Sequence, residues 1–302
     1  MGATACGKTQ LSLLLAQKLN AEIISVDSAL VYRGMNIGTA KPTLTERQGI
    51  THHLIDICDP WQSYSAAEFC KDACTLIDQI HKRQKSVLLV GGTMLYFKAL
   101  EHGLAKLPQA HEPTRRDLIQ ESKRVGWPAL HAKLQEVDQV AASRIHPNDS
   151  QRIMRALEVY QLTGEPLTSL QTHTAGLLPV KPVKFALMPG SRQWLHRRIE
   201  QRFDNMINEG FVDEVRRLYE HPKVSSDLPA MRSVGYRQAW EAINRSDTSI
   251  EWHDKAVAAT RQLAKRQLTW LRSMSDVQHI ACDSQTISEQ VSVILSALNE
   301  ST

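Results

Sequence analysis

The sequence has few cysteines, no long apolar run and no strong excess of one charge. Its five cysteines are odd in number, and only Cys70 and Cys74 lie close together in the 302-residue chain, which argues against a disulfide framework or a zinc cluster. The longest apolar runs, Leu11–Ala16 and Val87–Val90, fall far short of the roughly 18 residues of a membrane helix. No charged and then apolar leader opens the chain. We therefore expect a cytoplasmic protein without membrane contact, and we also expect a monomer.

Hydrophobic residues make up 42% and charged residues 23%, a globular mixture that excludes disorder and collagen-like order. Because the net charge is only +4, its distribution matters more than its total. Lys255–Arg272 contains five basic residues and no acidic one. On a helix, Arg261, Lys265 and Arg272 fall within roughly 40° of one another, and Leu263, Trp270 and Leu271 are expected on an opposite, packed face. Such a stripe is typical of a polyanion-binding helix, and a plain solvated face explains it equally well.

Strand and helix signals alternate in the N-terminal third of the chain and again after residue 183. Alternation of this kind predicts an α/β fold with a parallel sheet flanked by helices. Between them, strand signals vanish and helical segments follow one another. We expect a P-loop NTPase-like core of residues 1–106 and 183–302, interrupted by a helical insertion domain at 107–182. The expected strands are Glu22–Val26, Ser86–Val90 and Lys184–Met188. The expected helices are Lys8–Leu19, Ala66–Gln79, Met94–Leu100, Pro113–Val125, Trp127–Val137, Asn148–Leu162, Trp194–Glu209, Val212–Tyr219, Tyr236–Ile243 and Trp252–Arg272.

A phosphate-binding motif opens the chain and runs directly into the first expected helix. The residues Gly2-Ala3-Thr4-Ala5-Cys6-Gly7-Lys8-Thr9 satisfy the pattern G-x-x-x-x-G-K-[ST] of nucleotide-binding (ATP-type) loops. The glycines let the backbone wrap a phosphate, and the helix N-terminus adds partial positive charge. Lys8 would neutralise terminal phosphate oxygens, and the Thr9 hydroxyl could hold Mg²⁺.

The strand that ordinarily precedes a phosphate loop is missing from the given sequence, because only Met1 precedes Gly2. Either the natural start lies upstream of the given one, or the sheet lacks its central strand. We favour the first explanation.

An acid follows the expected strand Glu22–Val26, at the end where parallel sheets bind ligands. Asp27 could act as a general base, associate with Mg²⁺ as in NTPases, or cap the following turn. Residue types and spacing leave these three roles open. The strand Ser86–Val90 ends instead in Gly91-Gly92-Thr93, where small residues would let a ligand pass close to the backbone.

Blocks spread along nearly the whole chain resemble the tRNA dimethylallyltransferase family in its bacterial form. They are Val26–Ser28, Tyr32–Pro42, His52–Asp56, Gly91–Tyr96, Ile145–Asp149, Gln151–Glu158, Arg198–Phe203, Val234–Gln238 and Lys265–Arg272. The resemblance implies transfer of a dimethylallyl group from dimethylallyl diphosphate to N6 of the adenine 3′-adjacent to the anticodon, with release of diphosphate. It implies a P-loop-like core with a helical insertion that contacts tRNA, and Mg²⁺ as cofactor.

The resemblance also implies roles for individual residues. Asp27 matches the acid that accepts the amine proton, Thr93 a channel residue and Arg202 a diphosphate-binding arginine, and these three with Lys8 form the expected catalytic set. Gly2–Thr9 would bind the diphosphate, with Thr9 at the metal. Contacts to the anticodon stem-loop are implied for Ser28, Ala29, Leu30, Gln151, Arg152, Ile153, Met154, Arg155, Arg232, Ser233, Val234, Gly235, Tyr236, Arg237, Lys265, Arg266, Gln267, Leu268, Thr269, Trp270, Leu271 and Arg272.

The sequence departs from the family pattern at Cys6, where serine is usual, and at Asn36, where aspartate is common. Two other classes of function remain open. A small-molecule kinase would also use a phosphate loop and an acid at a strand end, together with an arginine-bearing lid. A non-catalytic RNA-binding protein would explain the basic helix but would leave Lys8, Thr9 and Asp27 without a role.

Overall fold

The computed structural model describes residues 1–171, 176–246 and 251–300 and divides the chain into two compact units. One unit comprises Met1–Leu100 with Leu177–Thr302, and the other comprises Glu101–Gly176. Both boundaries of the second unit lie six residues before the predicted 107 and 182. A hydrogen bond from the Leu177 amide to the Leu100 carbonyl, 2.9 Å long, joins the two chain segments that lead into and out of this insertion. This pairing across the insertion leaves no local signal in the sequence.

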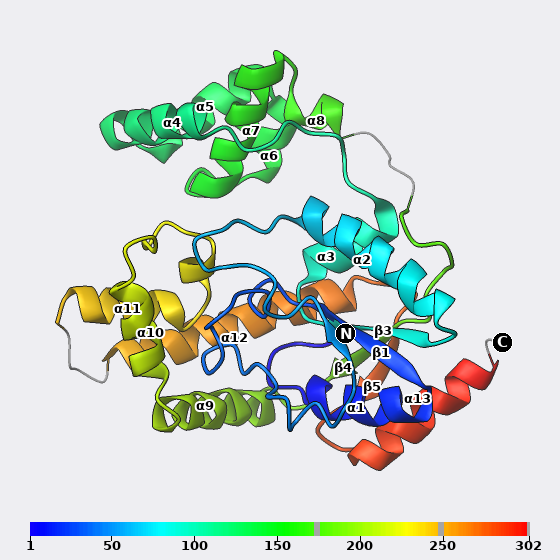
Figure 1. The fold of residues 1–302 in the computed structure, drawn as a ribbon. Helices are drawn as coiled ribbons and strands as arrows, with labels where there is room; N and C mark the ends of the chain where they lie inside the picture. Colours follow the sequence, from blue (N-terminus) through cyan, green and yellow to red (C-terminus); the bar gives the residue numbers. More distant parts are fainter. Residues whose placement is uncertain (172–175, 247–250, 301–302) are drawn as a thin grey trace. The chain divides into compact units, whose positions relative to one another are not determined.

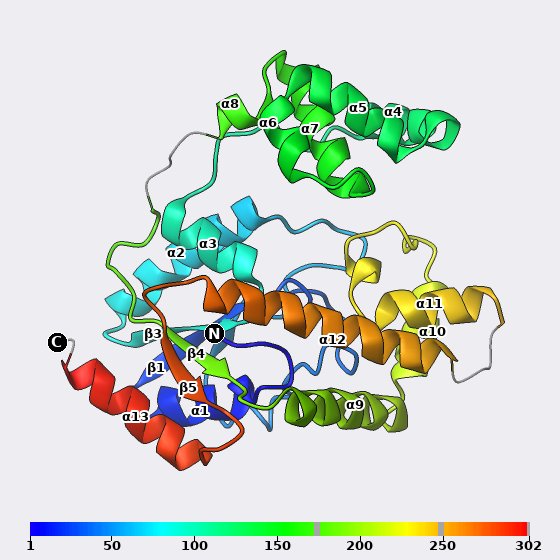
Figure 2. The same cartoon turned by 180° about the vertical axis from the view of Figure 1, so that it is seen from behind.

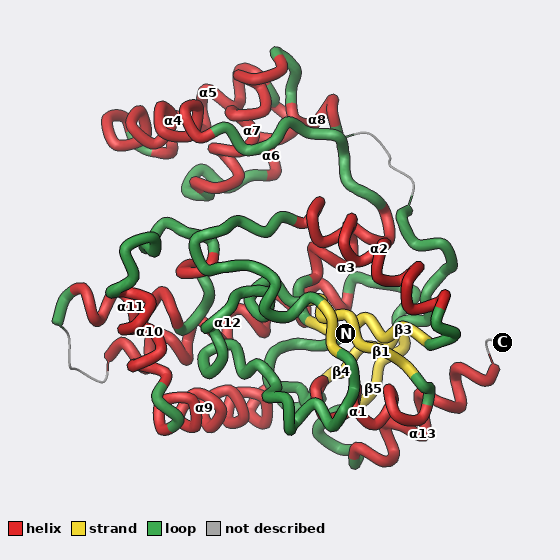
Figure 3. Tube along the Cα trace, in the orientation of Figure 1, coloured by secondary structure: helices red, strands yellow, loops and turns green. Residues whose placement is uncertain are grey.

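The first unit contains two small parallel sheets, drawn as arrows in Figure 1 and in yellow in Figure 3. In one sheet, β1 (Ala21–Val26) lies between β2 (His52–His53) and β3 (Ser86–Gly91). In the other, β4 (Phe185–Met188) pairs with β5 (Gln278–Ala281). Every residue of β1 is buried, as expected for a strand covered on both faces. The predicted α/β class with a parallel sheet is confirmed.

The first two residues run alongside β4, directly before the phosphate loop. Gly2 forms a parallel bridge with Leu187, and the Leu187 amide donates to the Met1 carbonyl at 3.0 Å. The Met1 nitrogen donates to the Phe185 carbonyl at 2.7 Å. The chain therefore enters the loop in an extended conformation, paired with a strand.

Several helices of this unit pack against the strands through apolar side chains. In α2 (Ala66–Lys82), a capping box between Ser65 and Glu68 starts the helix, and Phe69 and Ile77 are among its buried side chains. The helices α1 (Lys8–Lys18) and α13 (Ile287–Glu300) contact each other beside the strands (Figures 1 and 2). The other helices of this unit are α9 (Arg192–Asn208), α10 (Phe211–Tyr219), the 3₁₀ helix η1 (Ala230–Arg232), α11 (Tyr236–Asn244), α12 (Glu251–Arg272) and α3 (Met94–His102), whose last two residues fall in the second unit.

The second unit is helical and has a core of its own. Its helices are α4 (Glu112–Val125), α5 (Trp127–Val137), α6 (Gln139–Arg144), α7 (Ser150–Thr163) and α8 (Leu167–Leu170). Leu118, Leu130, Leu134 and Ile153 are almost completely buried against one another. None of the helices in the described part of the chain is both long and apolar enough to cross a membrane.

Candidate active site

Two residues of the phosphate loop, both before the start of α1, have positive φ angles that curve the backbone. Ala5 has φ 63° and Gly7 has φ 86°. Glycine adopts this conformation freely, whereas alanine does so at a cost. Gly7 occupies the N-cap of α1 and brings no side-chain acceptor, and no acidic residue lies in the first turn of the helix. The first amides of α1 thus keep their capacity to bind an anion.

Two amides of the loop are already engaged within the protein. The Thr4 amide donates to the Gln267 side-chain oxygen at 2.9 Å, and the Cys6 amide to the Ala3 carbonyl at 3.4 Å. The Cys6 side chain is buried, and a hydrogen bond with the Cys282 thiol lowers the pKa of Cys6. The substitution of the usual serine therefore lies in a packed environment.

Lys8 lies against its own loop. Its ammonium donates to the Ala3 carbonyl at 2.7 Å. Burial lowers the pKa of Lys8 to about 8, while the nearby Cys6 and Asp27 act in the opposite direction and Arg202 lowers it further. The motif lysine is thus a desolvated cation within electrostatic reach of an acid and a second cation, an environment typical of functional sites.

Asp27 follows β1 and caps the turn after it, one of the three roles open from the sequence. Its Oδ1 accepts from the Ala29 amide at 2.9 Å and from the Leu30 amide at 3.4 Å. Within the described residues no hydrogen bond engages Oδ2. The carboxylate raises the pKa of both Lys8 and Arg202, which places it within electrostatic range of the two cations. Capping fixes one oxygen and leaves the other for a ligand.

Arg202 reaches the phosphate loop from α9. Its guanidinium donates to Thr4 Oγ1 at 3.3 Å and to the Thr39 carbonyl at 3.2 Å, and burial lowers its pKa. One turn earlier, Arg198 Nε donates to the Ala5 carbonyl at 2.8 Å. The sequence assigned no role to Arg198, although its position four residues before Arg202 places both on one face of a helix.

Thr93 ties the ends of β1 and β3 together. Its amide donates to the Val26 carbonyl at 3.2 Å, and its Oγ1 accepts from the Ser28 amide at 3.1 Å. The glycines before it were expected to leave room for a ligand, and this expectation is wrong in part. A Cβ at Gly91 would lie 2.0 Å from the Val26 carbonyl oxygen, and one at Gly92 would lie 2.5 Å from Gln267 Nε2. Protein atoms occupy the space beside both glycines, because β1 and α12 approach the backbone there.

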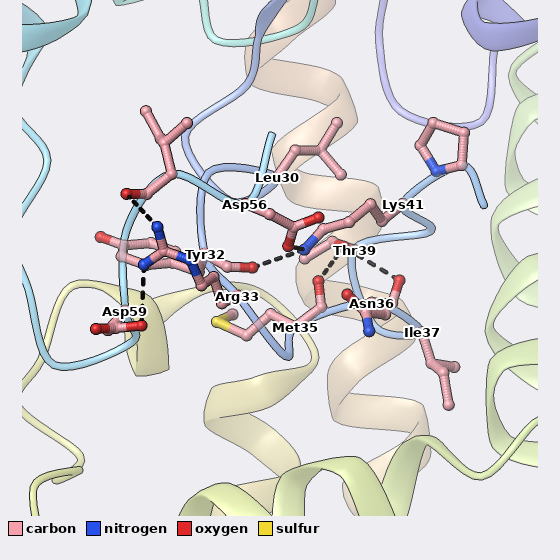
Figure 4. Close-up of polar contacts among 12 residues, drawn as sticks. Leu30, Tyr32, Arg33, Met35, Asn36, Ile37, Thr39, Lys41, Asp56 and Asp59 are labelled. Carbon is pink, nitrogen blue, oxygen red and sulfur yellow. Dashed lines mark hydrogen bonds and ion pairs between the residues drawn. The ribbon is translucent and has the colours of Figure 1, made fainter. Parts of the chain in front are cut away.

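A dense set of polar contacts holds the loop between Leu30 and Lys41 (Figure 4). The Lys41 ammonium donates to the Tyr32 carbonyl at 2.6 Å and to Asp56 at 2.5 Å. Thr39 Oγ1 donates to the Met35 carbonyl at 2.7 Å. Figure 4 shows the Lys41 side chain reaching Asp56 and the Tyr32 carbonyl, and the Thr39 hydroxyl facing the carbonyls of Met35 and Asn36. The Thr39 carbonyl, which accepts from Arg202, is thereby held in place.

The same loop is held from α10 by Glu214, which sequence analysis missed. Glu214 is only 2% exposed, and its Oε2 accepts from the Asn36 and Ile37 amides at 2.8 and 2.9 Å. Its Oε1 accepts from the Gly38 amide at 3.1 Å and from the Tyr236 hydroxyl at 2.5 Å. This contact raises the pKa of Tyr236, after burial as the main cause. The only available signal was the pair Asp213-Glu214 at the start of an amphipathic helix.

The predicted RNA-contacting residues of the first unit fall into exposed and packed groups. The exposed ones are Ser28, Arg232, Arg237, Lys265, Arg266, Thr269, Trp270 and Arg272. The half-buried ones are Ala29, Leu30, Ser233, Val234 and Gln267. The buried ones are Gly235, Tyr236, Leu268 and Leu271. The exposed group is rich in arginine and lysine, whereas the buried group packs the supporting helices.

The prediction of which face of α12 is packed is wrong for Trp270. This side chain was expected on the packed face, yet it is 39% exposed, with the Lys98 ammonium 5.7 Å from its ring centroid. The buried face is set by Ala264, Leu268 and Leu271. Arg261, placed on the basic stripe, donates to Glu200 at 3.1 Å, so part of its charge is neutralised.

In the second unit, the predicted stretch Gln151–Arg155 lies in α7. Gln151 and Arg152 are exposed, Met154 and Arg155 are half-buried, and Ile153 is buried. Arg155 donates to the buried Glu158 at 2.7 Å and to the Pro108 carbonyl at 2.7 Å. Only the first two side chains of the stretch are therefore fully presented to solvent.

A metal site built by protein groups alone does not occur in the described ranges. No group of three or more His, Cys, Asp or Glu residues there could hold an ion. Thr9, the predicted Mg²⁺ residue, is exposed at the start of α1. A single hydroxyl beside a phosphate loop fits Mg²⁺, which is commonly held by substrate phosphates and water with few protein ligands.

Comparison with known proteins identifies the family. A family model described as IPP transferase matches residues 30–274. A tRNA dimethylallyltransferase of Albidiferax ferrireducens is 53% identical, over 96% of this chain and 87% of the relative. One of Coxiella burnetii is 50% identical, over 96% and 97%.

Solved structures agree with this result. The tRNA isopentenylpyrophosphate transferase of Bacillus halodurans superposes with a TM-score of 0.73 at 38% identity, covering 99% of this chain and 94% of that one. A eukaryotic dimethylallyltransferase acting on tRNA gives 0.76 at 27% identity, covering 99% and 78%. With its α/β core, phosphate loop and matching sequence blocks, the chain belongs to the IPP transferase family.

Proposed function

We propose that this protein transfers a dimethylallyl group from dimethylallyl diphosphate to N6 of the adenine 3′-adjacent to the anticodon of a tRNA. The observation that carries the proposal is the grouping of Asp27, Lys8 and Arg202, in which an acid with one unengaged oxygen lies within electrostatic reach of two desolvated cations. Such a site can hold an anionic leaving group and accept a proton beside it.

The donor end of the site would be the phosphate loop. The free amides at the start of α1, the Lys8 ammonium and the Arg202 guanidinium would bind the diphosphate. Mg²⁺, when bound at Thr9, would neutralise further charge on the diphosphate oxygens. These groups stabilise the electron pair that the departing diphosphate takes from the allylic C1–O bond. Because they are held by the loop and by Thr39, little reorganisation is needed as charge develops.

The acceptor end would be Asp27 with Thr93. An adenine amine is a weak nucleophile because its lone pair is delocalised into the ring. Bond formation from N6 to C1 therefore accompanies loss of an N6 proton, and the free oxygen of Asp27 would accept it. Proton transfer of this kind contributes typically 10²–10⁴-fold to a rate. The base must leave its stack to reach the site, which costs a few kcal/mol.

The exposed basic residues of α12 would help to offset that cost by binding the RNA backbone. Lys265, Arg266 and Arg272 are all exposed, and Trp270 offers an exposed ring for stacking. Exposed residues of the second unit, Gln151 and Arg152, would add contacts to the anticodon stem-loop. Phosphate contacts make such binding weaker at high salt.

The test is a comparison of substrates. Incubation with labelled dimethylallyl diphosphate, Mg²⁺ and unmodified tRNA should yield prenylated tRNA, with the label on N6 of the adenine after the anticodon. A matched tRNA carrying guanine at that position should remain unlabelled. Phosphorylation of a small acceptor from ATP, with no label in tRNA, would favour a kinase and refute the proposal.

A further inference from the structure

Gln267 joins two parts of the site that are far apart in the sequence. It lies on α12, the long helix of Figure 2, and its side chain is half-buried. Its Oε1 accepts from the Thr4 amide at 2.9 Å, and its Nε2 donates to the Gly92 carbonyl at 2.8 Å. These two contacts allow only one orientation of the side-chain amide. The Thr4 N–H can donate only to its oxygen, and the Gly92 carbonyl can accept only from its nitrogen.

The backbone is shaped to receive this side chain. A Cβ at Gly92 would lie 2.5 Å from Gln267 Nε2, so glycine alone leaves room for the approach. On the other side, Thr4 is also held through its hydroxyl by Arg202. The Gln267 amide therefore links the phosphate loop to the turn that precedes Thr93.

Neighbours of Gln267 on the helix differ from it in their exposure to solvent. Lys265, Arg266, Thr269 and Trp270 are exposed, whereas both polar ends of the Gln267 amide are engaged by backbone groups. A residue in this state has little hydrogen-bonding capacity left for RNA, although the family resemblance groups it with the RNA contacts.

We propose that Gln267 is a positioning residue that sets the spacing between the diphosphate-binding loop and the Gly92–Thr93 turn. The inference rests on the proposed function for its meaning in catalysis. Because the Thr4 amide donates to Gln267, it is not available to the diphosphate, and the unengaged amides of the loop are. Holding the Gly92 carbonyl keeps Thr93 in place between the ends of β1 and β3. Loss of the amide loosens the donor site while the exposed RNA-binding side chains of α12 stay as they are.

The test compares Gln267→Met and Gln267→Ala with Gln262→Ala. Methionine keeps the length of the side chain without its polar atoms, alanine removes both, and Gln262 is an exposed glutamine on the same helix. Three quantities are measured: affinity for inorganic diphosphate, KM for dimethylallyl diphosphate, and tRNA affinity in the absence of donor. Two hydrogen bonds of ordinary strength correspond to about a tenfold change.

We expect both Gln267 variants to weaken diphosphate binding and raise the donor KM about tenfold, with tRNA affinity within about twofold of wild type. Gln262→Ala should leave all three unchanged. Wild-type values in Gln267→Met would reduce the role of Gln267 to packing and overturn the inference. Weakened tRNA binding with normal diphosphate binding would make it an RNA contact and also overturn it. If wild-type protein fails to prenylate tRNA, the proposed function falls, yet diphosphate affinity still decides the role of Gln267.

Discussion

Replacing Glu214 by glutamine would change the charge of a carboxylate that organises residues 36–38. In the best fit for the new amide, its oxygen takes the place of Oε2 and accepts from the Asn36 and Ile37 amides. Its nitrogen then faces the Gly38 amide, which loses its acceptor, while the Tyr236 hydroxyl can rotate to accept.

The magnitude follows from these contacts. An unsatisfied buried amide costs about 1–3 kcal/mol, and exchanging two charge-assisted bonds for neutral ones costs about 1 kcal/mol each. The neutral glutamine does not carry the desolvation cost of a buried carboxylate, and this gain offsets part of the sum. We expect Glu214→Gln to lower the free energy of unfolding by about 2–4 kcal/mol. The donor KM should rise as well, because the loop carries the Thr39 carbonyl that holds Arg202.

Urea unfolding followed by tryptophan fluorescence measures the loss. With a slope near 3 kcal/mol per molar urea, the midpoint should fall by about 1 M with the slope unchanged. The control is Glu209→Gln, which makes the same charge change at an exposed position and should shift the midpoint by less than about 0.2 M. A Glu214→Gln protein with the midpoint of that control would refute the reasoning, because the carboxylate would then contribute nothing to the loop.

Three further outcomes follow from the site. Asp27→Asn should lower kcat about 10²–10⁴-fold with tRNA affinity nearly unchanged, which single-turnover and filter-binding measurements would check; a near-normal rate would remove Asp27 as the base. Because burial lowers the pKa of Lys8 to about 8, free enzyme loses this charge as pH rises through that value, so kcat/KM for the donor should fall above about pH 8. Lys8→Ala should lack that fall, and its persistence would assign it to another group. Lys265→Ala should reduce the slope of log tRNA affinity against log salt by about 1 in magnitude, and an unchanged slope would mean that Lys265 touches no phosphate.

Much of the fold could be predicted because long helices and buried strands carry periodic signals. The range Trp127–Val137 was predicted as observed, and α12 was predicted within one residue of its start. Shorter elements contain too few residues to show a periodic pattern of apolar side chains. The strand β2 has two residues and exists through its pairing with β1, and β5 has four residues paired with β4. The helix α13 was not predicted either, although it has fourteen residues.

The sequence pointed to the motif residues of the site but not to the groups that hold them. Asp213 and Glu214 are adjacent acids, yet Asp213 is exposed and pairs with Arg216 while Glu214 is buried. Neighbours on a helix lie about 100° apart, so one can face solvent and the other a distant loop. Only the packed structure decides which loop. Trp270 shows the same limit, because the phase of α12 is set by its tertiary partners and not by its largest apolar residue.

The hydrogen bond from the Lys8 ammonium to the Ala3 carbonyl has a consequence for exchange of ligands. Through this contact, the lysine stabilises the curve of its own loop. In the proposed reaction, a diphosphate oxygen would compete with this neutral carbonyl oxygen for the ammonium, and the anion is the stronger acceptor. Under the proposed function, one cation would both fix the shape of the loop and neutralise the diphosphate, so the two roles would compete for the same ammonium.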